Sequence, residues 1–360
     1  MKYPPFISNT DTIGFVAPSF GCNVEPYKSA FQSALAFFQE QGHGLILGEN
    51  VYAGSGTGIS AAPEACGREL TDGYLSKDSR ALISCGGGEL MCEILDHVDF
   101  ERIREADPKW YMGYSDNTNF TFLLNTLCDT ASIYGPCAPA FGMQPRHAAI
   151  EDAYALLKGG KTAFAGYPYF EQESLKDETH PLEPYNAVVP SRKRVYVPEE
   201  TEETKDRPLS PRRMRLTEQE VRLEGRLLGG CMDCLVNLTG TVYDRVPDFC
   251  ERYREDGILW FLEACDLNVF GIRRALWQME HAGWFAHAKG FLIGRPYCNG
   301  QEMMGLDQYR AVIEPLAKHG VPVIMDLDIG HLPPMIPMMS GAMAKVQAAG
   351  NSFEIRYRCD

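Results

Sequence analysis

Several signals that would assign this chain to a common class are missing from its sequence. Basic residues are in the minority, since 34 Lys and Arg against 48 Asp and Glu give a formal net charge of −14. Such a charge disfavours nucleic acid and anionic membrane surfaces as partners. The first 20 residues contain no apolar run long enough for a signal peptide or a membrane span. We therefore expect a cytoplasmic protein with no nucleic acid partner and no membrane partner.

Cofactor and metal motifs are equally scarce. The dinucleotide fingerprint G-x-G-x-x-G is absent, and we find no phosphate-loop lysine. The 12 cysteines are scattered, and the only C-x-x-C, Cys231 to Cys234, lacks a second pair at zinc-ribbon spacing. We interpret this motif as structural, with redox or metal chemistry as the alternative. The expectation is reduced thiols, no cofactor and no metal.

The first half of the chain alternates between two kinds of pattern. Compact apolar runs predict strands, and apolar residues at helical spacing predict the helices between them. The strands are expected at 12–17, 44–47, 80–85, 109–113 and 132–135, and the helices at 27–41, 61–75, 89–95 and 118–128. This alternation predicts a parallel sheet covered by helices on both faces, whose ligands lie at the carboxyl ends of the strands.

The character of the sequence changes between residues 167 and 223, where prolines and charges of both signs replace any sustained period. Such a stretch is either a long excursion or a linker with functional loops. Beyond it, the patterns predict strands at 257–262, 290–294, 321–325 and 352–357, and a helix at 269–281. We expect an N-terminal α/β domain at 1–165, an extended loop or linker region at 166–224, and a C-terminal domain at 225–360.

The stretch from Lys109 to Leu124 contains a candidate nucleophile. It reads as an apolar strand, a sharp turn at 113–116 and an immediate helix, with Gly113 two residues before Ser115. This is the layout of a nucleophile elbow, in which a strained turn presents a hydroxyl near free helix N-terminal amides. The second glycine of G-x-S-x-G is Asn117 here. Taken alone, such a turn is more often a simple connection between a strand and a helix, but Ser115 is our candidate nucleophile.

A serine nucleophile needs a base, and the base needs a carboxylate that orients it. His331 follows a predicted strand on a proline-rich loop, where a catalytic base would be placed. Glu263 ends the apolar run Ile-Leu-Trp-Phe-Leu, where an unpaired carboxylate would be costly. A satisfied loop histidine and a locally paired glutamate are the alternatives, and Asp266 is the nearest competitor for the acid.

Acyl transfer also requires N–H donors for the oxyanion of the transition state. The N–H of Asp116, directly after the candidate nucleophile, is one such donor. A backbone amide of Gly87 or Gly88 is the other, because residues without side chains permit close approach. A phosphate-binding loop or a plain turn is the alternative interpretation of 86–88.

Taken together, these segments resemble the LD-carboxypeptidase family of serine peptidases, which includes muramoyl-tetrapeptide carboxypeptidases and the microcin C self-immunity hydrolases. The resemblance covers nearly the whole chain, and spaced motifs in one order are more specific than any single motif. The matching pieces are Ala17 to Ser19, Gly87-Gly88 with Asp99 to Ile103, Gly113 to Asp116, Gly225 to Gly230, Phe261 to Glu263, and Gly330-His331 with Pro334, Pro337 and Gly341.

The resemblance implies a triad of Ser115, Glu263 and His331, an oxyanion hole from the Gly88 and Asp116 amides, no metal, and a homodimer. It also implies a flavodoxin-like N-terminal sheet with helices on both faces and a C-terminal mixed, β-rich α/β domain. The long stretch 167–223 looks like the extended loop of the immunity enzymes.

The sequence departs from the family pattern at several positions. Glu89 follows the paired glycines, and Gly86 precedes them. The immunity enzymes have a tryptophan in the extended loop that stacks on a nucleobase, whereas the four tryptophans of this chain lie outside that loop. The aromatic residues that could replace it are Tyr167, Tyr169, Phe170, Tyr185 and Tyr196.

These observations lead to one function and two alternatives. We expect a serine hydrolase that cleaves a peptide or amide bond near a C-terminus of a small peptide. Action on a peptidyl or aminoacyl nucleotide, as in the microcin C immunity hydrolases, is the first alternative. A non-catalytic binding module for an anionic small ligand is the second.

Overall fold

A computed structural model describes residues 1–199 and 213–359. The described chain forms two compact units, and it passes between them five times. The N-terminal unit contains Met1–Thr162, Glu171–Val188 and Pro334–Gly341, and the C-terminal unit contains Ala163–Phe170, Val189–Pro333 and Ala342–Asp360 apart from the residues outside the described ranges.

A sheet with the strand order β17-β5-β4-β3-β1-β2 organises the described part of the N-terminal unit. Its strands are β1 Ile13–Val16, β2 Leu45–Leu47, β3 Ala81–Ser84, β4 Trp110–Gly113, β5 Ser132–Tyr134 and β17 Met338–Ser340. The first five are parallel, and β17 is antiparallel to β5. The parallel strands follow the flavodoxin-like order 2-1-3-4-5, which confirms the expected fold.

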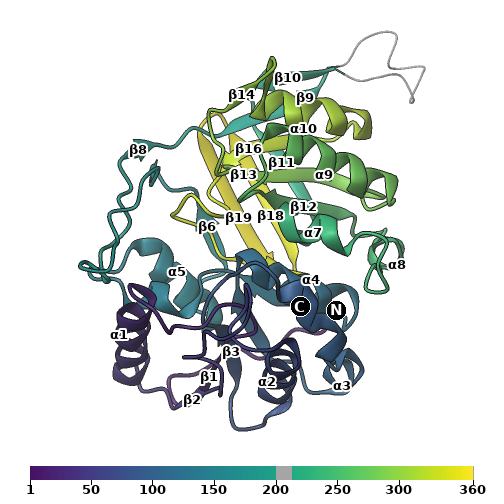
Figure 1. The fold of residues 1–360 in the computed structure, drawn as a ribbon. Helices are drawn as coiled ribbons and strands as arrows, with labels where there is room; N and C mark the ends of the chain where they lie inside the picture. Colours follow the sequence, from purple (N-terminus) through teal and green to yellow (C-terminus); the bar gives the residue numbers. More distant parts are fainter. Residues whose placement is uncertain (200–212, 360) are drawn as a thin grey trace. The chain divides into compact units, whose positions relative to one another are not determined.

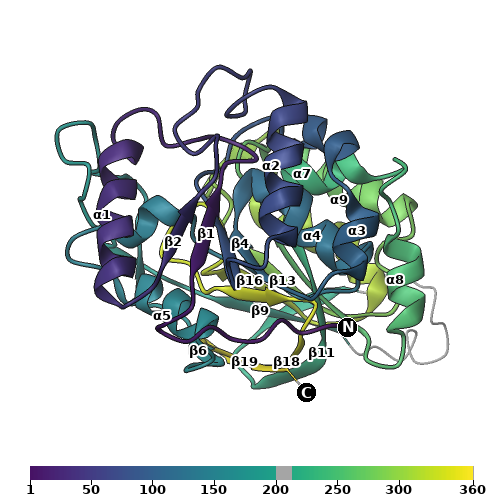
Figure 2. The same cartoon turned by 90° about the horizontal axis from the view of Figure 1, so that it is seen from below.

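Helices cover both faces of this sheet (Figure 2). One face carries α1 Tyr27–Glu40, the 3-10 helix η3 Ala138–Gly142 and α5 Ala148–Leu157, joined through aromatic contacts of Phe37 with Phe141 and Tyr154. The other carries α2 Pro63–Leu75, the 3-10 helix η1 Met91–His97, α3 Phe100–Glu105 and α4 Thr118–Thr126, whose apolar side chains share one core cluster. The periodicity of the sequence therefore predicted this unit well.

The described part of the C-terminal unit contains a larger mixed sheet of strand order β10-β9-β16-β13-β12-β11-β18-β19-β6. Its strands are β6 Ala163–Ala165, β9 Arg194–Pro198, β10 Met214–Thr217, β11 Val221–Cys231, β12 Ile258–Glu263, β13 Ala288–Gly294, β16 Val323–Leu327, β18 Met343–Ala349 and β19 Ser352–Arg358. The central strands β11, β12, β13 and β16 are parallel, and the flanking strands are antiparallel. The expected mixed, β-rich domain is confirmed.

The helices in the described part of this unit are α7 Met232–Leu238, α8 Val246–Arg252, α9 Val269–His281 and α10 Gln308–Leu316 with the 3-10 helix η4 Ala317–His319. Figure 1 shows α9 and α10 side by side on one face of the sheet, next to α7. Two short antiparallel strand pairs complete the described elements: β7 Tyr169–Phe170 with β8 Val189–Pro190, and β14 Glu302–Met303 with β15 Leu306–Asp307.

The stretch 167–223, which we expected to be a long excursion or a linker with functional loops, contains several strands. It contains β7, β8, β9, β10 and the start of β11, while residues 200–212 lie outside the described ranges. The strand β9 is stabilised by pairing with β16 and β10 rather than by an apolar period of its own, since only Val195 of its residues is buried. A strand that is stabilised mainly by its neighbouring strands is hard to predict from the apolar pattern of its own sequence. The strand β17, which pairs with β5, was not predicted either, because its three residues, although all buried, are too few to show a strand period.

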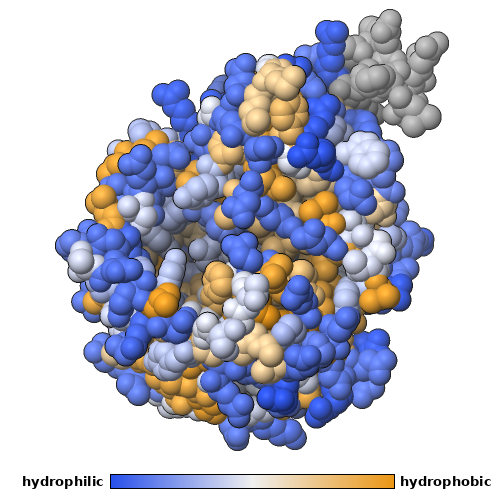
Figure 3. Space-filling view, in the orientation of Figure 1, coloured by the Kyte–Doolittle hydropathy of each residue, from blue (hydrophilic) through white to orange (hydrophobic). Residues whose placement is uncertain are grey.

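The visible surface is mostly polar. On the face drawn in Figure 3, apolar residues form separate patches among hydrophilic ones, as is usual for surface apolar residues. Within the described residues, no helix combines the length and the apolar character that crossing a membrane requires. The cysteines of this part of the chain form no disulfide.

Candidate active site

Ser115 lies at the end of the fully buried strand β4, at the first residue of the 3-10 helix η2 Ser115–Asn117, which leads directly into α4. Its φ is 63°, a left-handed conformation that is uncommon for a residue with a side chain. Such strain persists only where the surroundings impose it, and it occurs often at functional sites. The strand, strained turn and helix of an elbow are therefore present at this serine.

Asn117 holds the turn in place. Its Nδ2 donates to the carbonyl oxygen of Gly86 at 2.7 Å and to that of Tyr114 at 3.1 Å, and its Oδ1 accepts a hydrogen bond from the Tyr111 hydroxyl. The residue is fully buried. Sequence reasoning treated Asn117 only as a departure from a glycine motif. In the structure it ties the turn to the glycine loop.

The carboxylate of Asp116 is committed to the fold. It accepts hydrogen bonds from Ser19 Oγ at 2.6 Å, from the N–H of Met91 at 2.9 Å and from Asn119 Nδ2 at 3.0 Å. Burial raises the pKa of this carboxyl group, against the opposing effect of these hydrogen bonds. The side chain thus fastens three segments around the turn, which leaves the backbone N–H as the part of Asp116 suited to an oxyanion.

The glycine loop approaches the serine closely. A Cβ on Gly87 would lie 3.0 Å from Ser115 Cβ and 3.1 Å from Ser115 Oγ, so a side chain here would crowd the hydroxyl. The carbonyl oxygen of Gly87 accepts a hydrogen bond from the N–H of Phe20 at 2.8 Å. Gly88 packs against Ser19 Oγ and the carbonyl oxygen of Gly58. Its role as an oxyanion donor stays a prediction.

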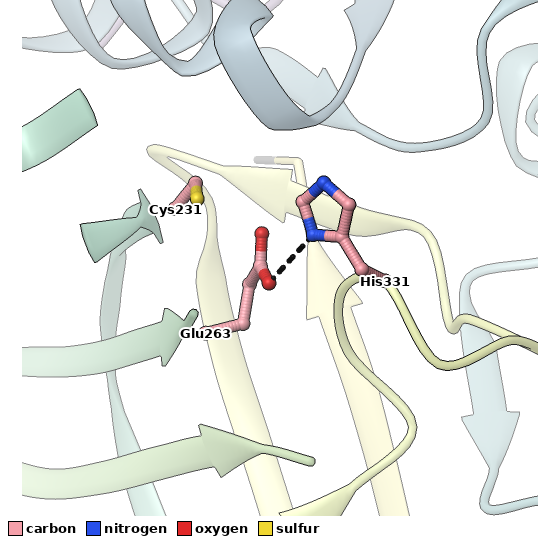
Figure 4. Close-up of side chains that lie close together, drawn as sticks. All are labelled: Cys231, Glu263 and His331. Carbon is pink, nitrogen blue, oxygen red and sulfur yellow. Dashed lines mark hydrogen bonds and ion pairs between the residues drawn. The ribbon is translucent and has the colours of Figure 1, made fainter. Parts of the chain in front are cut away.

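Glu263 and His331 meet in the C-terminal unit (Figure 4). His331 Nδ1 lies 2.9 Å from Glu263 Oε2, with the ring nitrogen as donor because a carboxylate accepts. Glu263 is the last residue of β12 and is fully buried. Gly330 has φ 100°, and a Cβ there would lie 2.6 Å from Glu263 Cδ, so the loop reaches the carboxylate only with glycine at this position. The structure brings the two predicted residues together.

The surroundings of His331 shift the pKa of its imidazole. Burial lowers the pKa of His331, but the Glu263 carboxylate and the contact with the Cys265 thiol outweigh burial and hold this pKa well above its ordinary value. A carboxylate at Nδ1 also fixes the tautomer and the orientation of the ring.

Two further residues hold the segments that carry this pair. Asp233, in the first turn of α7, accepts hydrogen bonds from the N–H groups of Cys265 at 3.0 Å, Asp266 at 2.8 Å and Leu267 at 3.1 Å. It therefore fixes the loop after Glu263, and it places the competing candidate Asp266 in that loop. Sequence reasoning missed Asp233, whose only local signal is an acid at a helix start.

Arg295 supports the histidine loop from both sides. Its Nη1 donates to the carbonyl oxygen of Asp326 at 2.9 Å, and its Nη2 donates to Asp328 Oδ1 at 2.6 Å and to the carbonyl oxygen of Leu332 at 3.4 Å. Lys193 Nζ lies 3.2 Å from the other oxygen of Asp328. These side chains are almost fully buried, and the single Asp328 carboxylate pairs with both cations. An arginine directly after an apolar strand was the available signal.

Cys231 is the remaining polar group beside the pair. It ends β11, where it lies opposite Glu263 in the parallel register. One ligating atom from each of Cys231, Glu263 and His331 lies within 4.8 Å of the others. Cys231 Sγ also donates to Asp233 Oδ2 at 3.3 Å. The C-x-x-C interpreted as structural thus begins next to the candidate site.

Two family models match the two halves of the chain. The LD-carboxypeptidase N-terminal domain matches residues 13–135, and the LD-carboxypeptidase C-terminal domain matches residues 224–346. The chain belongs to the LD-carboxypeptidase family. Ser115 lies within the first match, and Glu263 and His331 lie within the second.

Known LD-carboxypeptidase relatives extend over almost the whole chain. A probable murein peptide carboxypeptidase of Bacillus subtilis (strain 168) is 26% identical over 96% of this chain and 92% of the relative. The microcin C7 self-immunity protein MccF of Escherichia coli is 22% identical over 96% of this chain and 93% of MccF. Relatives of both kinds therefore share this architecture.

The fold is that of solved MccF-like structures. An MccF-like protein from Bacillus anthracis str. Ames has a TM-score of 0.78 at 19% identity, with 99% of this chain and 100% of the other covered. MccF in complex with aspartyl sulfamoyl adenosine has a TM-score of 0.73 at 18% identity, with 99% of each chain covered. At these identities, the likeness establishes the fold class.

Proposed function

We propose that this protein is a serine hydrolase that cleaves a peptide or amide bond near a C-terminus, with Ser115 as nucleophile, His331 as base and Glu263 as the acid that orients His331. The observation that carries the proposal is the 2.9 Å contact between His331 Nδ1 and the buried Glu263 carboxylate. A buried carboxylate with this partner is the arrangement that a catalytic base needs. Membership of a serine peptidase family supports the assignment.

In the proposed reaction, Ser115 Oγ attacks the carbonyl carbon of the scissile bond while His331 Nε2 takes the hydroxyl proton. The negative charge on the carbonyl oxygen is stabilised by the N–H of Asp116 and an amide of the glycine loop. His331 then returns the proton to the leaving amine, which breaks the C–N bond and leaves an acyl-enzyme. Water, deprotonated by the same imidazole, hydrolyses the ester and restores the serine.

The direct test is hydrolysis of two substrate classes by the wild type and by the Ser115→Ala variant. A murein tetrapeptide represents the carboxypeptidases, and an aminoacyl sulfamoyl adenosine represents the nucleotide substrates. We expect the wild type to release product from at least one of them, and the variant to lose at least about 10³-fold in kcat while keeping its unfolding midpoint. Full activity of the variant would exclude Ser115 as the nucleophile.

Hydrolysis of an aminoacyl or peptidyl nucleotide is the second candidate function. The relative MccF has been solved in complex with aspartyl sulfamoyl adenosine, and stacking of the base requires an exposed aromatic ring. Of the five aromatic residues considered above, Tyr169 has the most exposed side chain, at 50%. Phe170 is covered by the Arg295 guanidinium, and Tyr185 lies against the His147 ring.

The Tyr169→Ala variant separates the two functions. If Tyr169 stacks on a nucleobase, its removal costs about 1–3 kcal/mol of binding, so KM for an aminoacyl nucleotide rises roughly 5- to 150-fold while KM for a murein peptide is unchanged. The matched control is Tyr27→Ala, a similarly exposed tyrosine at the start of α1. Equal effects of the two variants on nucleotide hydrolysis would contradict the stacking role.

A further inference from the structure

Three groups with different metal-ligand chemistry converge at the ends of two neighbouring strands. Cys231 and Glu263 face each other across β11 and β12, and His331 reaches the same point from the loop after β16. Figure 4 shows the thiol, the carboxylate and the imidazole pointing toward one another, and one ligating atom of each lies within 4.8 Å of the others. The proposed hydrolysis uses only Glu263 and His331, which leaves the thiol without an assigned role.

We propose that Cys231, Glu263 and His331 form a binding site for Zn²⁺ or a similarly thiophilic divalent cation. In tetrahedral zinc sites the bonds are about 2.3 Å to sulfur and about 2.0–2.2 Å to nitrogen and oxygen. Ligating atoms around such an ion are therefore roughly 3.3–3.7 Å apart. The 2.9 Å contact of His331 with Glu263 and the 4.8 Å limit for all three groups bracket this spacing. Small side-chain rotations are enough to admit the ion.

The donor set favours zinc over the hard cations. Magnesium and calcium prefer oxygen ligands, whereas sulfur and imidazole ligands suit zinc. Two more thiols lie near the site in the sequence, since Cys234 is in the first helical turn after Cys231 and Cys265 is two residues after Glu263. One of these, or a water molecule, supplies the fourth ligand. A thiolate and a carboxylate together balance the two charges of the cation.

Binding requires a defined movement of protons. The Cys231 thiol loses its proton to water as the sulfur–metal bond forms. Because the metal takes the Nδ1 lone pair, the proton between His331 Nδ1 and Glu263 moves to Nε2 of a neutral ring, or to water when Nε2 already carries a proton. The ring then has no free lone pair for a substrate proton. The site is thus inhibitory, a consequence that rests on the proposed function of His331, whereas metal binding itself does not.

The experiment uses the metal-free full chain in a reductant that does not bind zinc. Co²⁺ is added first, because a cobalt–thiolate bond gives a charge-transfer absorption that oxygen and nitrogen ligands do not produce. Zn²⁺ affinity is then measured by competition with a chromophoric chelator. We expect one ion per chain, a cobalt–thiolate band, and an affinity that falls about tenfold or more in both Cys231→Ser and Glu263→Gln. The matched control Cys92→Ser, a half-buried cysteine of the N-terminal unit, should bind as the wild type does.

Absence of the thiolate band in the wild type, or equal zinc affinity of the wild type and Cys231→Ser, would overturn the metal site. The proposal requires a loss of zinc affinity in both variants, which lie on different strands. Misfolding of one variant alone therefore does not decide the result. Hydrolysis is assayed separately with Zn²⁺ and then with a chelator. Zinc that binds without inhibiting would support the metal site and contradict His331 as the base.

Discussion

At the scale of single residues, the candidate site depends on two glycines that permit close approach. Gly87 leaves room beside the Ser115 hydroxyl, and Gly330 leaves room beside the Glu263 carboxylate. In both places a side chain would collide with a group that the proposed chemistry uses.

The Gly330→Ala variant tests this dependence. The positive φ costs about 1–3 kcal/mol for a residue with a side chain, and the new Cβ would also press on Glu263. We expect an unfolding free energy lower by about that amount and a kcat lower by on the order of 10²-fold, because a displacement of about 1 Å is enough for such a loss.

The control is Gly283→Ala. Gly283 also has a positive φ, 79°, but a Cβ there would meet nothing within 4 Å. It should therefore reproduce the backbone strain with little change in kcat. If both variants lost activity to the same extent, the contact between Gly330 and Glu263 would have no special role.

At the scale of elements, the strand ends supply the candidate residues and the helix starts hold them. The ends of β4, β11 and β12 carry Ser115, Cys231 and Glu263, as expected for parallel sheets. The first turn of α7 carries Asp233, whose carboxylate fixes the backbone of 265–267. Asp233 therefore acts on Glu263 and His331 only by positioning.

The Asp233→Ala variant should lower kcat by up to on the order of 10²-fold, because the loop after Glu263 loses its anchor. KM should change little if Asp233 does not touch substrate. The control is Asp248→Ala, which removes an acid from the first turn of the neighbouring helix α8 and thus the same interaction with a helix dipole. Equal losses in kcat and in thermal stability for the two variants would show that Asp233 contributes only as a helix-start acid.

The sequence was informative where a local pattern reflects burial. Apolar periods predicted strands β1 to β5 and helices α1, α2 and α4 of the N-terminal unit, but not α3 or α5. The cost of burying a charge singled out Glu263 at the end of an apolar run. Asn117, Asp233 and Arg295 could not be found in this way, because their roles consist of hydrogen bonds to residues distant in sequence or to backbone groups. The strand β9 escaped prediction because its partners, rather than its own residues, stabilise it, and β17 because three residues are too few to show a period.

At the scale of the whole molecule, the candidate nucleophile and the candidate base belong to different compact units. Ser115 lies in the N-terminal unit, and Glu263 and His331 lie in the C-terminal unit. The two family matches separate the same residues, because the N-terminal match contains Ser115 and the C-terminal match contains Glu263 and His331. The proposed function therefore makes one central claim, that the imidazole of one unit activates the hydroxyl of the other.

Covalent labelling tests this claim most directly. A fluorophosphonate reacts with a serine whose hydroxyl is deprotonated by a neighbouring base, and the labelled residue is identified by peptide mass spectrometry. We predict one adduct per chain on Ser115 in the wild type, no adduct in Ser115→Ala, and labelling at least about 10²-fold slower in His331→Ala, with Cys92→Ser labelled at the wild-type rate. Labelling of Ser115 at the same rate in the wild type and in His331→Ala would contradict the account.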